Sequence, residues 1–355
     1  MPRVVHYAEQ ALLGALLLEP ARLADTGTLI ATHFDNHSHA SLFTAIRTLP
    51  PPDPDLHAKD PTWLNQVLDN ARPDAPGLDA PYLHALIQFC PQPRHAPAYA
   101  RMIRADHARR TLRLHAERLT QTATDSTGPD PATAVLTRAD AFGRVLDDLA
   151  GQFAPHPGSL PRTLPTADVV RQAGEEDLDE ERLLLATAIA RPEETQRMRW
   201  LAPQDFTTPL HAALWQSVTA LVHRGDMVDV VTVLGETQHR GLLTTSLTPR
   251  DLMDLISMPT GSPEYWGERI LQRALLARAR TVAERITAYT DDFANTPHQL
   301  ITGSRRALAD LTAVRTRWHH ATSPGPTARA ARAGATAPPR AGPPRTTAPA
   351  TRISR

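Results

Sequence analysis

The sequence predicts an all-α protein made of two tandem copies of one helical unit. Alanine, leucine and arginine are abundant and aromatic residues make up 5% of the 355 residues, a composition that favours helices over sheets. Apolar residues recur at helical spacing in segments that are separated by proline-rich loops. A chain of this length has room for two or three ordinary domains, each with its own core.

The two copies are related by a constant offset of 172 residues over their first part. The segment EQALLGALLLEP at 9–20 aligns with ERLLLATAIARP at 181–192, and residues 29–49 align with 201–221 in the same register. Later matches have shorter offsets: Leu86 and Ile87 with Leu255 and Ile256, Tyr99 with Trp266, and AERL at 116–119 with AERI at 283–286.

A period of this length indicates two duplicated domains, not a solenoid of short repeats. The positions that recur in both copies are mostly apolar, and we expect them to form the core of each copy. They are Leu12, Leu13, Phe34, His39, Phe43, Leu184, Leu185, Phe206, His211 and Trp215.

Each copy is expected to fold as a small helical head followed by an antiparallel helical hairpin. The first helix of each head, near 7–19 and 179–191, is almost wholly apolar, which is typical of a helix buried on most sides. A second helix follows a capping residue, which is Asn36 or Ser38 in the first copy and Thr207 or Thr208 in the second. The hairpins pair residues 95–122 with 132–150 and residues 263–291 with 297–316.

These segments divide the chain into a first domain at 1–150, a linker at 151–178, a second domain at 179–318 and a tail at 319–355. The tail is mainly Ala, Pro, Thr, Arg and Gly and is predicted to be disordered. Its last 35 residues hold six arginines and no acid, which leaves a net charge of −6 on the rest of the chain. The tail is interpreted either as a compositional fringe or as an electrostatic tether to nucleic acid or an acidic partner.

The sequence argues against an enzyme. The chain has one lysine, Lys59, with no glycine before it in a P-loop pattern, so no nucleotide-hydrolysing motor of that type is expected. There is no G-x-S-x-G motif, and Cys90 has no patterned histidine or asparagine partner. The longest apolar run, at 11–18, is too short to cross a membrane. We predict a cytoplasmic protein with no catalytic residue and no cofactor.

A metal site is considered because four potential ligands lie close together in the sequence, namely His33, Asp35, His37 and His39. The equivalent positions of the second copy are Asp205, Thr207, Pro209 and His211, so only the last histidine recurs. We therefore predict no metal and interpret both recurring histidines as core or capping residues near a helix start, where a ring nitrogen satisfies a backbone group.

The order of these segments resembles the N-terminal domain of the bacterial replicative helicase DnaB, and the resemblance occurs in both copies. In the first copy the resemblance rests on residues 9–20, a following DF-x4-H-type segment and YARMI at 99–103. In the second copy it rests on APQDFTTPLHAALWQSVTALVHRGDMVDVVTV at 202–233. The second copy has Ala186 where the family has glycine, and the first copy has a proline-rich stretch in place of the family's G-x-x-V-D segment.

The resemblance implies a domain of assembly. In that family the N-terminal domain is a helical head with a hairpin, forms a collar of paired domains above a ring of motors, and receives primase and loader proteins. The motor domain is missing from this sequence. We therefore predict a non-catalytic adaptor of DNA replication that binds the helicase, primase or loader and pairs its two copies within one chain. The alternative is a nucleic-acid-binding accessory protein that acts through the arginine-rich tail.

The hairpins are the predicted partner-binding surfaces. Six arginines between 101 and 118 encircle their helix, which favours a solvated and partly ion-paired helix over a phosphate-binding stripe. Contact of the tail with DNA and self-association of the chain remain open alternatives, and no membrane contact is expected. The residues predicted to bind partners are Tyr99, Arg109, Arg110, Arg113, Trp266, Arg269 and Arg278.

Overall fold

The structure, a computed structural model, describes residues 3–125, 128–155, 158, 160–163, 174–242, 248–255 and 259–323, without the side chains of Asp251 and Leu255. This part of the chain is helical and contains no strand, which confirms the all-α prediction. No helix within it is long and apolar enough to cross a membrane. Ile256, predicted to match Ile87, and the tail beyond Ser323 lie outside the described residues.

The first head is built around α1 (Val4–Leu18), an apolar helix whose Leu12 and Leu13 are fully buried. The helix that follows a capping residue, as predicted, is α2 (His37–Thr48), and Asn36 is its cap because the Asn36 side chain accepts from the backbone N–H of His39 at 3.2 Å. The other elements of this head are η1 (Pro20–Thr26), η2 (Ala31–His33), α3 (Pro54–His57), α4 (Thr62–Ala71), α5 (Ala80–Phe89) and η3 (Pro93–His95).

The second head repeats this arrangement around α8 (Glu175–Ala190) and α10 (Pro209–Arg224). Thr208 caps α10 by accepting from the backbone N–H of His211 at 3.1 Å. The helix ends at Gly225, whose φ of 74° lies in the left-handed region that glycine adopts without a steric penalty. The other elements of this head are α9 (Pro192–Thr195), η4 (Pro203–Asp205), α11 (Val230–His239) and α12 (Pro249–Leu255).

One departure of the second copy from the family pattern has a packing explanation. In the first head α5 packs along α1, and a Cβ atom on Gly14 would come within 2.1 Å of the carbonyl oxygen of Leu86. Only glycine allows that approach of two backbones. The second head has Ala186 at the equivalent position, and there α12 packs mainly against α11. The second copy therefore tolerates the additional methyl group.

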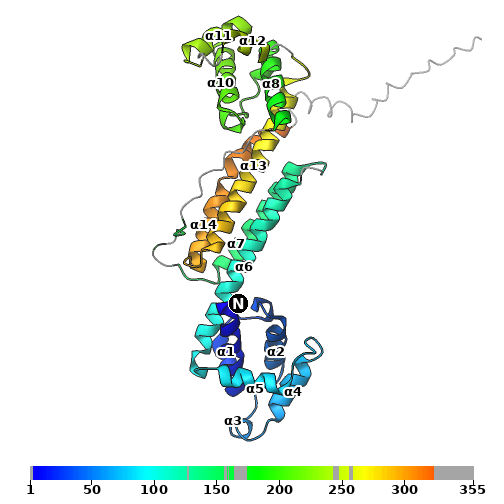
Figure 1. Ribbon diagram of the computed structural model, residues 1–355, viewed down its shortest axis with the longest axis vertical. Helices are drawn as coiled ribbons and strands as arrows, with labels where there is room; N and C mark the ends of the chain where they lie inside the picture. The colour runs from blue at the N-terminus through cyan, green and yellow to red at the C-terminus, as the bar shows by residue number, and fades with distance from the viewer. Residues whose placement is uncertain are drawn as a thin grey trace, which may run out of the picture.

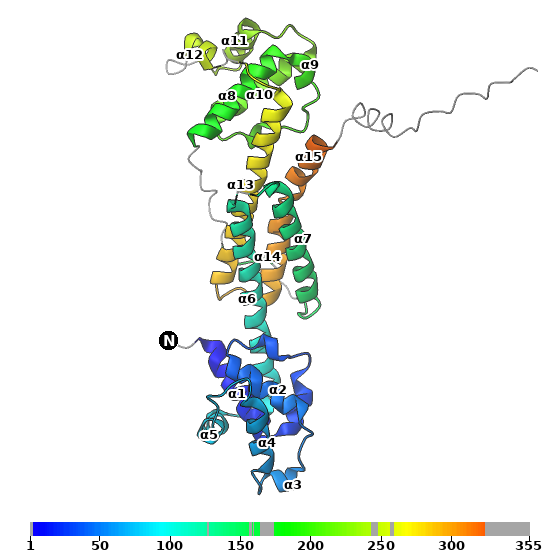
Figure 2. The ribbon, with the colours of Figure 1, turned by 90° about the vertical axis from the view of Figure 1, so that its right-hand side faces the viewer.

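The stem between the heads is a four-helix bundle to which each copy contributes a hairpin. It contains α6 (Ala96–Thr124) and α7 (Pro131–Ala150) from the first copy and α13 (Pro263–Asp291) and α14 (Pro297–Ala309) from the second. Figures 1 and 2 show the heads at opposite ends of an elongated molecule with this bundle between them. The most extensive helix contact of the described chain is between the copies, where α6 packs on α13.

The second hairpin and its end differ from the sequence prediction. The predicted helix at 297–316 is interrupted after Ala309, and a separate helix, α15 (Thr312–Thr322), follows. This helix extends past residue 318, where the tail was predicted to begin, because Val314 and Trp318 are buried against the second copy. At the other boundary α8 begins at Glu175, inside the predicted linker.

Two hydrogen bonds fix the antiparallel register of α6 and α13. The Arg109 side chain donates to the carbonyl oxygen of Thr290 at 2.7 Å, and Arg280 donates to that of Ala123 at 3.5 Å. This register places Ala116 opposite Ala283, two positions that are equivalent in the repeat and fully buried. The small side chains allow the two longest helices to approach closely at the centre of the stem.

The described part of the linker lies against the turn between α13 and α14. The Arg162 backbone N–H donates to the buried side chain of Asn295 at 2.8 Å, and the Thr163 hydroxyl donates to Asp292 at 2.8 Å. A Cβ atom on Gly303 would collide with the ring of Pro161, so the linker approaches α14 closely. These contacts join the end of the first copy to the far end of the second hairpin.

We expect Ala116→Leu to lower the free energy of unfolding by about 1–3 kcal/mol, because a larger side chain between packed helices forces them apart. Urea unfolding followed by circular dichroism measures the change. Ala134→Leu, at an exposed position of α7, is the control and should change the free energy by no more than about 0.5 kcal/mol. Equal effects of the two substitutions would contradict the assigned register.

Candidate partner-binding surfaces

A buried glutamate and histidine join the first two helices of the first head. Glu9 on α1 and His39 on α2 are fully buried, and His39 Nδ1 lies 2.7 Å from Glu9 Oε2. The other carboxylate oxygen accepts from the backbone N–H of Asp35 at 2.6 Å, and His39 Nε2 lies 2.7 Å from the hydroxyl of Tyr82. The carboxylate is thus hydrogen-bonded on both oxygens, which a buried charge requires.

The second head contains the same pair at positions 172 residues later. His211 Nδ1 lies 2.7 Å from Glu181 Oε2, and the backbone N–H of Thr207 donates to Glu181 Oε1 at 2.7 Å. The outer contact differs, because Tyr82 binds the histidine of the first pair, whereas in the second pair Arg273 donates to the glutamate, Glu181, at 2.8 Å. Arg273 also binds Asp177 and Glu180, so α13 and α8 are held together by several charges.

The four side chains that were considered as metal ligands do not converge. The His37 ring lies 2.9 Å from the carbonyl oxygen of Asp74, and the His33 ring packs against that of His107. A different set, His6, Glu9 and His39, brings three potential ligand atoms within 4.8 Å of one another. The second copy has Leu178 at the position of His6 and still keeps the glutamate–histidine pair. Because the glutamate–histidine pair persists in the second copy without a third potential ligand, we explain the pair by its role in holding two helices of the head together.

In each copy an arginine from a helix outside the head binds an equivalent loop of that head. In the first copy Arg110 on α6 donates to the carbonyl oxygen of His33 at 2.7 Å and pairs with Asp106 at 2.7 Å. In the second copy Arg317 on α15 forms a two-pronged ion pair with the buried Asp205, which is the residue equivalent to His33. The two copies therefore use different helices for the same attachment.

The predicted partner-binding arginines of the first hairpin are used within the chain. Arg109 donates to the carbonyl oxygens of Thr290, Asp292 and Asn295 at 2.7–2.9 Å, and its guanidinium lies 4.9 Å from the centre of the Phe293 ring. Burial lowers the pKa of Arg109, although Asp106, Asp292 and Asp291 oppose this. Next to it, Arg113 pairs with Asp291 and Glu117. These side chains join the two copies, a role that a helical wheel of α6 alone does not reveal.

The other predicted partner-binding residues lie where the long helices leave the heads. Tyr99 is partly buried against the core of the first head. Trp266 is partly buried and donates from its indole N–H to the carbonyl oxygen of Thr260 at 2.6 Å, and Arg269 pairs with Glu180. Arg278 is partly exposed on α13. The structure does not bring these residues together into one surface.

Apolar side chains of both copies are exposed where the first head meets the stem. A cavity of about 490 Å³ lies there, and it is open to Val4 of α1, Met102 of α6 and Phe293 of the α13–α14 turn. Val4 is 71% exposed and Phe293 is 75% exposed. The second head exposes Met227 and Val231 after α10, in the segment that resembles the family's G-x-x-V-D run. The sequence did not single out any of these five residues as functional.

The comparisons with known proteins identify the family. The model of the DnaB-like helicase N terminal domain matches residues 1–105 and 174–272, which together are more than half of the chain. The chain therefore belongs to this family, and its two matched segments coincide with the two heads and the beginnings of α6 and α13. This supports a role related to the replicative helicase.

The chain is similar to the replicative DNA helicase DnaB of Mycobacterium leprae (strain TN). The two are 29% identical over 147 residues, which cover 41% of this chain and 23% of that helicase. The match therefore spans about a quarter of the length of this curated relative. No solved structure matches the chain.

We expect Glu181→Gln to destabilise the protein by about 2–3 kcal/mol and Glu9→Gln by about 1 kcal/mol. A glutamine at position 9 still accepts from Asp35, and its amide can donate to His39 once the ring proton moves to the nitrogen facing Tyr82. At position 181 the amide would likewise face His211, but the substitution also removes the negative charge that binds the guanidinium of Arg273 at 2.8 Å. Urea unfolding gives the two energies, and amide hydrogen exchange assigns each loss to its head. Equal losses would contradict the difference between the two sites.

A second prediction concerns the stability of the protein at acidic pH. His33 and His107 have ring centres 4.5 Å apart. Burial, then the neighbouring His107, Arg104 and Arg110, lower the pKa of His33 to about 4, and burial also lowers the pKa of His107. The unfolded chain binds these protons near pH 6.5 and the folded chain only at lower pH. Stability from the neutral rings is therefore complete above about pH 6.5 and is lost as the pH falls toward 4.

Thermal unfolding between pH 7 and 4.5 measures this effect. The double variant His33→Asn/His107→Gln should show a smaller decrease in melting temperature over this range than the unmodified chain. His84→Gln, at an exposed position of α5, should keep the original pH dependence. An unchanged slope in the double variant would show that other groups carry the acid sensitivity.

Proposed function

We propose that the chain is a non-catalytic adaptor of DNA replication that binds the replicative helicase through its two heads. The observation that carries this proposal is the stem. Two domains of the helicase N-terminal family are joined in one chain, and their hairpins pack on each other along the C-terminal halves of α6 and α13. The heads are then presented at fixed positions at the two ends of the bundle (Figure 2).

The role of the covalent connection follows from effective concentration. Two hairpins in separate chains associate in proportion to protein concentration, whereas hairpins in one chain meet at an effective concentration set by the linker. Contacts of the linker with Asn295 and Asp292 restrict it further. We infer that one chain imitates a pair of helicase N-terminal domains, which gives it surfaces for the helicase, or for a primase or loader that recognises such a pair.

Binding to purified cognate proteins tests the proposal. We expect the full chain to co-elute with the replicative helicase in size-exclusion chromatography with light scattering. The variant Arg109→Ala/Arg113→Ala, which removes contacts between the copies, should weaken that complex roughly tenfold because it loosens the placement of the heads. Arg118→Ala, at an exposed position of the same helix, is the matched control and should bind normally. Failure of helicase, primase and loader to bind would exclude the adaptor function.

Truncation after Ser323 distinguishes the adaptor from a protein that acts through its basic tail. It removes residues 324–355 and leaves α15 with Arg317 and Trp318 in place. The adaptor keeps its complex with the replication protein after truncation. Loss of DNA binding together with an absence of any protein complex would support the alternative.

A further inference from the structure

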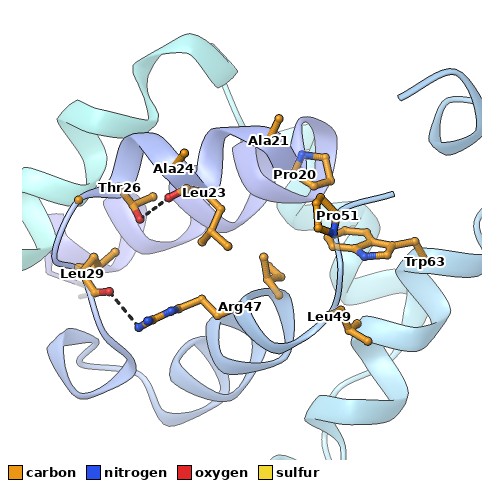
Figure 3. Close-up of a pocket in the computed structure, with 12 residues that line it drawn as sticks. Pro20, Ala21, Leu23, Ala24, Thr26, Leu29, Arg47, Leu49, Pro51 and Trp63 are labelled. Carbon is orange, nitrogen blue, oxygen red and sulfur yellow. Dashed lines mark hydrogen bonds between the residues drawn. The ribbon is translucent and has the colours of Figure 1, made fainter. Parts of the chain in front are cut away.

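A groove on the first head lies between the segment after α1 and the end of α2. Its volume is about 450 Å³, which is within the range of sites that bind small molecules or short peptide side chains. Figure 3 shows Leu23, Leu29, Leu49 and Trp63 around it and the Arg47 side chain extending across it toward Leu29. The groove thus has apolar walls and a single cation.

The second head has a groove at the equivalent place. Its volume is about 420 Å³, and seven of its nine lining residues lie 172 positions after residues that line the first groove. Leu201 corresponds to Leu29, and Thr219 corresponds to Arg47. A cavity that recurs in both copies of a duplicated unit is a feature of the fold and not a local packing fault.

Both grooves lack acidic residues in a chain whose remaining body is acidic. No Asp or Glu lines either cavity, although acidic residues outnumber basic ones by six before the tail. Each groove has an arginine, Arg47 in the first and Arg199 in the second. In the described part of the chain neither arginine forms an ion pair, and Arg47 donates one bond, to the carbonyl oxygen of Leu29 at 3.3 Å. Most N–H groups of Arg47 thus remain available for a carboxylate.

The two grooves differ in the side chains around the cation. The apolar lining of the first is mainly leucine, isoleucine, proline and tryptophan, whereas the second combines apolar residues with the polar Gln196, Thr219 and His223. An apolar side chain would therefore be buried more favourably in the first groove than in the second. The cation of the second groove is at a different position, because Arg199 corresponds to Gly27 and Thr219 to Arg47, which makes this groove an internal comparison.

We propose that the groove of the first head binds a short segment of a partner protein in which an apolar side chain lies next to a carboxylate. The apolar side chain packs beside Leu49 and Trp63, and the carboxylate pairs with the guanidinium of Arg47. Charge complementarity selects this occupant. It disfavours the tail of the chain itself, because residues 324–355 contain six arginines and no acid. The proposal is independent of which replication protein binds elsewhere on the chain.

Selection from a phage library of random 12-residue peptides on the full chain tests the proposal. We expect enrichment of peptides that have Asp or Glu beside Leu, Ile, Phe or Trp. A labelled selected peptide should bind roughly tenfold more weakly to Arg47→Glu, because the charge reversal repels its carboxylate. Arg199→Glu in the second head is the matched control and should leave the affinity within about twofold. Replacing the acidic residue of the peptide by Asn or Gln should cause a loss similar to that from Arg47→Glu.

Three outcomes would overturn the proposal. The first is that no such sequence is enriched, and the second is that the selected peptides bind Arg47→Glu as well as they bind the unmodified chain. The third is a dimer in light scattering that Arg47→Glu dissociates, since the occupant would then be a second copy of this chain. The indole N–H resonance of Trp63, assigned with Trp63→Phe, gives an independent readout, because it shifts only if the peptide enters this groove.

Discussion

The packing of α6 against α13 is the interaction on which the remaining structure depends. The inner face of α6 consists of alanines and leucines that are almost completely buried, and α13 presents a matching face. A two-helix hairpin cannot bury such a stripe on both sides by itself, so each hairpin needs the other. This burial joins the first hairpin to the core of the second copy, while the first head keeps a separate core. It also determines that the heads point to opposite ends.

The two copies share the same arrangement of helices in their heads but differ in the contacts around it. Both keep the buried glutamate–histidine pair that fixes the first helix of the head to the start of the next one. The helix that binds the equivalent loop of the head is different, because Arg110 of α6 does so in one copy and Arg317 of α15 in the other. The residues that stabilise the inside of a head are thus the same in both copies, whereas the residues that connect the head to neighbouring helices differ.

The sequence predicts the helical class and most of the repeated core because both follow from local spacing. The ten residues proposed for the core are all buried in the structure. The glutamates that accompany His39 and His211 also had a detectable signal, since each is a charged residue in an apolar helix at the same repeat offset. The sequence contains no comparable signal for the contacts of Arg109. Arg109 donates to backbone carbonyl oxygens of the α13–α14 turn. The direction of a carbonyl oxygen cannot be predicted from the pattern of side chains in the sequence.

The same limitation explains the boundary at the end of the second copy. Composition changes gradually from α15 into the tail, and helix α15 continues to Thr322 because Trp318 packs on the second copy and Arg317 binds Asp205. Such long-range contacts decide where a short helix ends, since a helix of this length is only marginally stable alone. Sequence periodicity therefore predicts that an element exists more reliably than it predicts its last residue.

The buried stem also restricts how a partner can recognise this chain. The faces of the hairpins that a second hairpin would contact are already occupied within the molecule, and Arg109 and Arg113 are committed to those contacts. A partner that leaves the bundle intact is therefore restricted to the heads, the junctions and the outer surface of the stem. The heads have similar helix arrangements and different surfaces, because the groove of the second head is lined by more polar residues than that of the first. Duplication followed by divergence of the heads thus gives one rigid chain two non-equivalent ends, which a symmetric pair of identical domains cannot provide.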